Sequence, residues 1–137
     1  RAVVAGLSNE RLEARYRKWT LRQIVHHLAD SHMHSLIRFK WALTENLPTI
    51  KAYDEAAWVQ LHDSHRGDVE PALAMLEGLH ARWVQLLHAL DESDFARQFF
   101  HPESARNVSL WEALSYYAWH GAHHTPQIAW VREQHGW

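Results

Sequence analysis

The residues most capable of chemistry in this sequence are its histidines, of which there are 13 among 137 residues. His120 and His124 are four positions apart, so on a helix their imidazoles lie one turn apart on the same face. Two imidazoles in this arrangement can bind one divalent cation and leave room for a third ligand from another element. A second pair, His26 and His27, occurs near the start of another predicted helix. The spacing therefore predicts a three-histidine metal site that combines the first pair with either His26 or His27.

The helix face that carries His120 and His124 also carries apolar and aromatic residues, so it is expected to point into the core. Its members are Ala113, Tyr117, His120, His124, Ile128 and Val131. A buried polar group without a partner costs about 1–3 kcal/mol, and either a cation or ordinary hydrogen bonds would remove that cost. Spacing alone favours the ordinary alternative, a pair of core histidines, and it also allows His120 to pair with His123.

The surroundings of the other histidine pair leave its register open. His27 lies on the apolar stripe of its helix, whereas His26 lies about 100° around the helix, close to Asp30 at the i+4 position. Asp30 could orient an imidazole, act as a base or simply be a surface charge. His32 and His34 have no comparable partner on their own helix, so both side chains are expected to be solvated.

The sequence contains no cysteine, which excludes disulfides, thiolate ligands and a cysteine nucleophile. Any metal must therefore be bound by histidine or carboxylate side chains. A structural zinc site normally has four protein ligands, so a three-histidine site would keep a position open for water or a substrate. A divalent ion lowers the pKa of a bound water to about 7 and lowers that of a bound thiol for the same electrostatic reason.

Length and composition are typical of a globular protein with a single domain over residues 1–137. Hydrophobic residues make up 47% and charged residues 22% of the chain. A net charge of −2, with lysine and arginine scattered singly, argues against nucleic-acid binding. No apolar run reaches the roughly 20 residues needed to span a bilayer. Since the lack of cysteine fits a reducing compartment, a cytoplasmic protein is expected.

Three long helices are predicted to position the histidines. The first and the last each follow a capping box, formed by Thr20 with Gln23 and by Ser109 with Glu112. The first is expected to run for about 24 residues from Leu21, because apolar residues recur there at helical spacing. The last is expected to continue almost to the end of the chain.

The region between these two helices predicts a middle helix and several shorter elements. The middle helix is expected to begin with Pro71 at its first position, where the missing N–H costs nothing. Short helical turns are predicted after Asp54 and Asp91, which are suitable N-caps. Residues 63–68 and 99–108 are predicted to be loops. No segment shows convincing strand alternation.

Together with a helix end over residues 1–7, these elements predict an all-α antiparallel four-helix bundle. The first helix of that bundle is expected to be truncated: either most of it lies upstream of Arg1, or another subunit supplies the missing face. Pro126 lies within the last helix, where it removes a hydrogen bond and clashes with the Ala122 carbonyl. A kink or a widened turn is therefore expected there.

Six longer motifs occur in order along the chain. They are W-T-L-R-Q-I-V-H-H-L-A-D-S-H-M (19–33), I-R-F-K (37–40), A-L-T-E (42–45), Y-D-E-A-A-W (53–58), F-H-P-E (100–103) and Y-A-W-H-G-A-H-H (117–124). This series resembles the DinB/YfiT superfamily of metal-binding four-helix bundles, often described as metal-dependent hydrolases. The resemblance is to the YfiT branch, which includes the bacillithiol S-transferases.

Taken position by position, the resemblance places the family's metal ligands on His27, His120 and His124, and so selects His27 over His26. It implies a zinc or nickel ion and a homodimer. From the YfiT branch it also implies a low-molecular-weight thiol, such as bacillithiol, as a co-substrate.

Three features depart from the family's pattern. Gln127 stands where close relatives often have a further histidine, which puts the role of that position in question. Pro126 replaces a residue without a ring. Relatives usually carry a glycine pair before the Trp19–Thr20 step, whereas here Arg17 and Lys18 lead directly into it.

The resulting hypothesis is a metal-dependent enzyme that transfers a thiol to a small electrophile, with Asp30, Arg38 and Tyr53 as candidate substrate contacts. A metal-dependent hydrolase that activates water would use the same three histidines. A third alternative is a non-catalytic, metal-binding stress-response module in which the histidines hold the bundle together. A bundle without any metal is the fourth.

Overall fold

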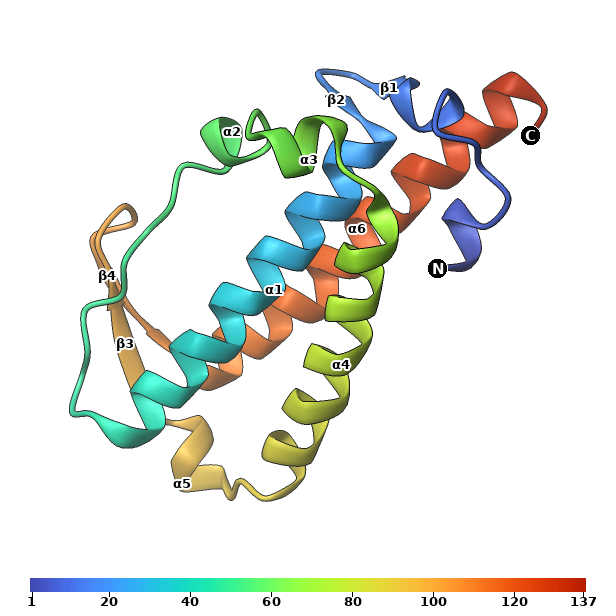
Figure 1. Ribbon diagram of the computed structural model, residues 1–137. Coiled ribbons are helices and arrows are strands. Elements are labelled where there is room, and N and C mark those ends of the chain that lie inside the picture. Colours follow the sequence, from blue (N-terminus) through green and yellow to red (C-terminus); the bar gives the residue numbers. More distant parts are fainter.

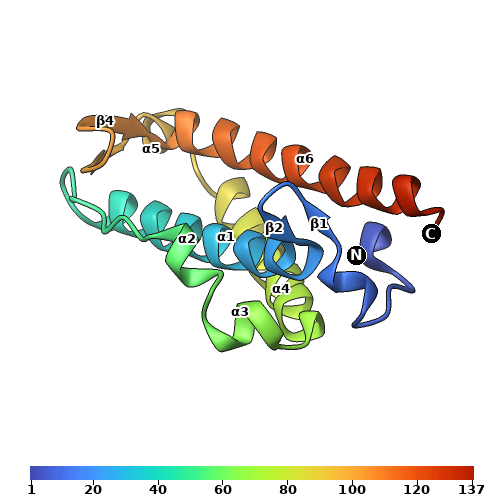
Figure 2. The ribbon, with the colours of Figure 1, turned by 90° about the horizontal axis from the view of Figure 1, so that it is seen from above.

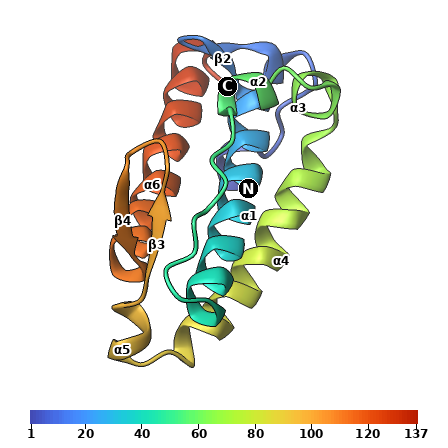
Figure 3. The same cartoon turned by 90° about the vertical axis from the view of Figure 1, so that its left-hand side faces the viewer.

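Three long helices dominate the computed structural model, which describes all 137 residues (Figure 1). They are α1 (Leu21–Thr44), α4 (Val69–His88) and α6 (Leu110–His135). In the view from above, α1 lies between α6 and α4 (Figure 2). The helix α6 runs antiparallel to the other two, and α1 and α4 share a direction because the segment between them returns along the bundle (Figure 3). The predicted helical bundle is confirmed.

The ends of α1 and α6 are fixed by the two predicted capping boxes. Thr20 Oγ1 accepts a hydrogen bond from Gln23 N at 3.1 Å, and Gln23 Oε1 accepts one from Thr20 N at 3.0 Å. Ser109 and Glu112 make the equivalent pair of bonds at the start of α6. Because each cap fixes the first helical turn, it also fixes which side chains of that helix face inwards. None of the helices combines the length and the hydropathy needed to cross a membrane.

The short helices agree in part with prediction. Asp54 caps α2 (Glu55–Trp58) and Asp91 caps α5 (Glu92–Phe95), as expected. The prediction of a loop over residues 63–68 is wrong, because α3 (His62–Arg66) occupies most of it. Ser64, at the centre of α3, is only 1% exposed, so the packing of this turn against the bundle outweighs its polar composition.

Pro71 lies two positions further into its helix than predicted, because α4 (Val69–His88) begins earlier. The N-cap of α4 is Asp68, whose carboxylate accepts a hydrogen bond from Glu70 N at 3.1 Å, and Pro71 is the third helical residue. A proline is tolerated there for the predicted reason, since an N–H in the first turn has no partner within the helix.

Two small hairpins correct the expectation that the chain has no strands. β3 (Gln98–His101) pairs with β4 (Arg106–Ser109) in the region predicted to be a loop. Phe99 lies opposite Val108, and both are buried, so the hairpin is held by an apolar cross-strand pair. β1 (Arg15–Tyr16) and β2 (Trp19–Thr20) form a second pair just before α1.

The chain begins with two single turns of 3₁₀-helix, Ala2–Val4 and Arg11–Glu13, so the helix end expected over residues 1–7 is confined to one turn.

The apolar core consists of two clusters with a polar layer between them. One cluster includes Leu21, Ile24 and Ile128, and the other includes Phe39 and Tyr117. On α6 the two buried histidines lie between the clusters, since they follow Tyr117 and precede Ile128. The functional side chains are therefore held between two well-packed regions of the bundle.

Candidate metal centre

Three buried imidazoles, those of His27, His120 and His124, converge between α1 and α6. One ring nitrogen from each lies within 4.8 Å of the others. The Nε2 atoms of His27 and His120 are 3.2 Å apart. Two nitrogens bound to a tetrahedral zinc at about 2.0–2.1 Å would be separated by roughly 3.3–3.4 Å. The spacing of His27 and His120 in this three-histidine cluster therefore fits a divalent cation, and the third nitrogen, within 4.8 Å of both, is near enough to join them after a local shift of its ring.

Burial keeps the cluster in the protonation state that metal binding requires. It lowers the pKa of His27 to about 3 and that of His120 to about 3, and the neighbouring His124 lowers both further. The pKa of His124 is also lowered by burial. All three rings are therefore neutral at pH 7, with lone pairs available to a cation.

Helix α1 and the β1–β2 hairpin determine which residue of the first histidine pair joins the cluster. His27 points towards α6, and the ring of Trp19 on β2 covers it at 4.7 Å between centroids. His26 is also buried, but its Nε2 atom has no partner and it is not part of the cluster. The structure thus brings His27, rather than His26, next to His120.

Gln127 orients His124 from the next turn of α6. Its Oε1 atom lies 2.8 Å from His124 Nδ1, so the Nδ1–H group donates to the amide and Nε2 remains free. The amide nitrogen donates in turn to His123 Nε2 at 2.9 Å. Gln127 lies at i+3 from His124 and i+4 from His123, a spacing that could have indicated this role from the sequence.

A chain of imidazoles leads away from His120 on the side opposite the cluster. His120 Nδ1 lies 3.4 Å from His32 Nε2, and His32 Nδ1 lies 2.8 Å from His80 Nε2 on α4. The prediction that His32 is solvated is wrong, since it is 4% exposed. Its partners come from α4 and α6, so the spacing within α1 could not reveal them. If Nε2 of His120 binds a cation, Nδ1 keeps its proton and donates to His32.

The prediction that His34 is solvated is also wrong. This side chain is half-buried, its Nδ1 donates to the Asp30 carbonyl oxygen at 2.8 Å, and its ring stacks on Tyr53 at 4.2 Å. Asp30 lies close to Asp63, and burial followed by that second carboxylate raises its pKa to about 6. Asp30 does not belong to the histidine cluster.

Pro126 leaves α6 intact. The helix is α-helical from Leu110 to His135, so the widened turn expected at this position is absent. Pro126 and Ala122 are both exposed, and the carbonyl that loses its helical partner can therefore bind water instead.

Two cavities meet at the three-histidine cluster. The larger has a volume of about 560 Å³ and is lined by Arg38 and Tyr53, two of the candidate substrate contacts. The smaller, of about 290 Å³, is lined by all three histidines of the cluster. The two cavities share Glu55, Tyr116 and His120. Asp30, the remaining candidate, lines neither of them.

Glu55 is a site residue that was not predicted, although it lies within the motif at residues 53–58. Its Oε2 atom lies 3.8 Å from His27 Nε2, and because His27 is neutral this contact is not an ion pair. The carboxylate is about half exposed at the junction of the two cavities, where it can accept a proton from a bound molecule.

Proteins of known sequence are similar to this chain over almost its whole length. A sequence model described as the DinB superfamily matches residues 1–128. YfiT from Bacillus subtilis (strain 168) is 45% identical over 137 residues, which is 98% of this chain and 77% of that protein. A protein from Geobacillus thermodenitrificans (strain NG80-2) is 46% identical over 140 residues, which is 100% of this chain and 78% of that protein. The names of both describe a proposed metal-dependent hydrolase.

A solved structure has the same fold. Bacillus subtilis YfiT, described as a four-helix bundle of unusual topology, matches with a TM-score of 0.96 and 45% identity. The match covers 99% of this chain and 79% of that one. By sequence and by structure, this chain belongs to the DinB superfamily.

Proposed function

We propose that this protein is a metal-dependent enzyme that transfers a low-molecular-weight thiol to a small electrophile. His27, His120 and His124 would hold a zinc or nickel ion, which their neutral rings and their mutual spacing support. Three protein ligands leave at least one coordination position for a substrate. When bound, the ion would lower the pKa of a thiol at that position and stabilise its thiolate.

The meeting of two cavities at His120 is the observation that carries this proposal. A transferase must hold two molecules with their reacting atoms in contact, and two cavities of about 560 and 290 Å³ that share an edge meet this requirement. A hydrolase needs one such cavity and a water. Glu55 would take the thiol proton, the sulfur would form a bond to the electrophilic carbon, and the leaving group would depart with the bonding electron pair.

The test combines metal analysis of untagged protein with thiol-conjugation kinetics. We expect about one zinc or nickel ion per chain, and thiol-dependent turnover of a generic electrophile such as 1-chloro-2,4-dinitrobenzene. The double variant His120→Ala/His124→Ala should lose both the ion and the turnover. His88→Ala, which changes an exposed histidine at the end of α4, is the matched control. Retention of activity by the double variant would refute the proposal.

Hydrolysis is the second candidate, and the position of Glu55 favours it. A carboxylate 3.8 Å from His27 Nε2 can take a proton from an attacking water, and the names of the two relatives point to the same reaction class. Turnover of an ester or amide without added thiol, lost in Glu55→Gln, would identify a hydrolase. If the metal raises the free energy of unfolding and neither the thiol-conjugation assay nor the hydrolysis assay shows turnover, the three histidines have a purely structural role.

A further inference from the structure

The guanidinium of Arg38 is a buried positive charge without a counter-ion. Arg38 is 8% exposed, and its Nη1 atom donates to the Tyr117 hydroxyl at 3.0 Å. Its Nε atom has no hydrogen-bond partner, and no carboxylate lies within 4.0 Å of the side chain. A buried charge is normally paired, because its desolvation is otherwise uncompensated. Since Arg38 lines the larger cavity, an anion bound there would supply the missing partner.

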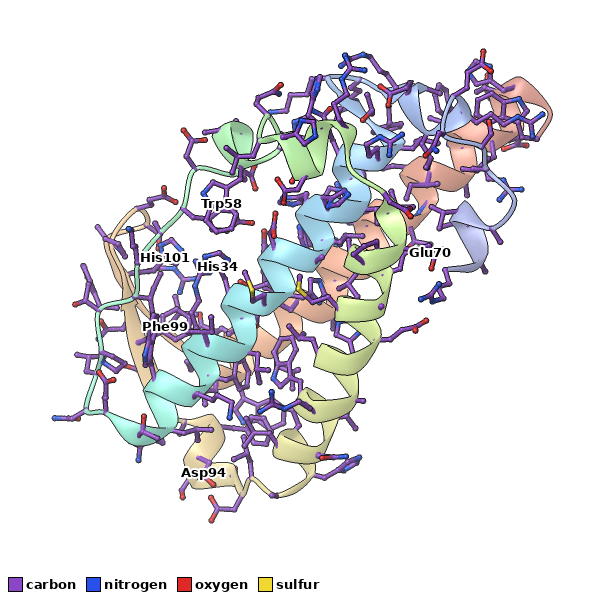
Figure 4. The ribbon with its side chains drawn as sticks, in the orientation of Figure 1. His34, Trp58, Glu70, Asp94, Phe99 and His101 are labelled. Atoms are coloured by element: carbon purple, nitrogen blue, oxygen red, sulfur yellow. The ribbon has the colours of Figure 1, made fainter.

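Two further side chains of the same cavity have buried polar atoms without partners. They are the hydroxyl of Tyr53 and Nδ1 of His101. Burial raises the pKa of Tyr53, so its hydroxyl stays protonated and can donate. Burial, and then the charge of Arg38, lower the pKa of His101, which is therefore neutral and can donate through one ring nitrogen. In the view of Figure 4 the side chains of His34 and His101 lie between α1 and β3, and the ring of Trp58 packs against that of His34.

The carboxylates that line the larger cavity do not neutralise Arg38. Asp54 caps α2, and Glu112 both caps α6 and binds Arg106 at 2.9 Å. Glu55 lies beside His27 and makes no ion pair with Arg38, and Glu103 is exposed on the hairpin. Of the two arginines that line this cavity, Arg106 is therefore paired with a carboxylate and Arg38 is not.

We propose that Arg38, Tyr53 and His101 form a carboxylate-binding subsite, and that the substrate in the larger cavity is a small organic acid. The guanidinium can donate from Nε and Nη2 to the two oxygens of one carboxylate, a geometry that suits arginine. The subsite is linked to the three-histidine cluster by Tyr117, whose hydroxyl binds Arg38 and whose ring lies 6.2 Å from that of His120. That the bound acid is a substrate rests on the proposed function, whereas the presence of a carboxylate-binding subsite does not.

The test measures the binding of succinate to the protein by calorimetry, with succinamide as the neutral analogue. We expect succinate to bind and succinamide to bind at least about 10-fold more weakly. Arg38→Gln should weaken succinate binding by about 10- to 100-fold. Arg38→Lys keeps the positive charge but cannot donate two parallel hydrogen bonds to one carboxylate, so its affinity for succinate should lie between those of the wild type and Arg38→Gln.

Two controls separate this subsite from folding defects and from the metal centre. Arg106→Gln removes a cationic side chain from the same cavity that is already paired with Glu112, and it should keep the wild-type affinity. His120→Ala/His124→Ala should also still bind succinate, whatever its activity. Circular dichroism would establish that Arg38→Gln and Arg38→Lys are folded. Failure of the wild type to bind succinate, or equal binding by folded Arg38→Gln, would overturn the proposal.

Discussion

Replacement of His32 by leucine tests the imidazole chain behind the proposed metal centre, and we expect it to weaken zinc binding by about 10-fold. His32 is 4% exposed and accepts the Nδ1–H of His120 when Nε2 of that ring faces a cation. Leucine fills similar space but offers no acceptor. The metal-bound form of the variant therefore buries an N–H group without a partner.

The size of the effect follows from the two states of His120. An unpaired buried N–H costs about 1–3 kcal/mol, which corresponds to a 5- to 150-fold change in affinity. In the metal-free form, His120 can carry its proton on Nε2 instead, where His27 Nε2 accepts it at 3.2 Å. The penalty then falls only on the metal-bound form. Because 3.4 Å is long for the bond that is lost, we expect a value in the lower half of that range.

The assay is a zinc titration of metal-free protein against a chromophoric chelator of known affinity. His32→Gln, which keeps an acceptor, should bind zinc more tightly than His32→Leu. His34→Leu, two residues along the same helix and outside the cluster, is the matched control and should bind as the wild type does. Wild-type affinity in a folded His32→Leu protein would show that His32 does not orient His120.

Acid should destabilise the metal-free protein, because His27, His120 and His32 have native pKa values of about 3, 3 and 4, below the unfolded value of about 6.5. Their stabilisation is complete above pH ~6.5 and is lost as the pH falls towards 4, by up to about 1.4 kcal/mol per pH unit for each ring. Asp30, whose pKa is raised to about 6, partly offsets this loss below pH 6. Urea unfolding between pH 4.5 and 7 would measure the loss, and a free energy of unfolding that does not change with pH would contradict it. Zinc at 100 times its Kd should raise the free energy of unfolding by about 2.7 kcal/mol and Tm by roughly 10 °C, reversibly by chelation, as calorimetry would show. Phe39→Ala, at a side chain that is 0% exposed, should cost about 3–5 kcal/mol in urea unfolding while the folded protein keeps its zinc affinity; a loss below 1 kcal/mol would be inconsistent with the packing.

The parts of the fold that local chemistry determines were predictable from the sequence. Both capping boxes and the inward stripe of α6 occur as predicted, because a cap and a periodic face depend on residues at most a few turns apart. The β3–β4 hairpin was missed because each strand has four residues and the turn between them lacks an Asn-Gly or Asp-Gly signal. It is instead stabilised by the packing of Phe99 against Val108.

At the proposed metal centre, the spacing of residues in the sequence indicated the histidine pair on α6 but not the side chains that surround this pair. His32 was expected to be solvated because nothing on α1 pairs with it, whereas its partners are 48 and 88 residues away in the chain. Glu55 reaches the cluster only because the segment after α1 returns along the bundle. Contacts of this kind depend on the path of the whole chain, which no local pattern encodes.

The three-histidine cluster joins residues that are 93 positions apart, on the first and the last long helix. In a chain without cysteine, a cation held there would act as a removable cross-link that closes a very long loop. A permanent link across a loop of about 100 residues is worth roughly 4.7 kcal/mol in lost chain entropy. Metal supply would then control how tightly α6 is held against α1, and amide exchange in the C-terminal half of α6 would slow when zinc is bound.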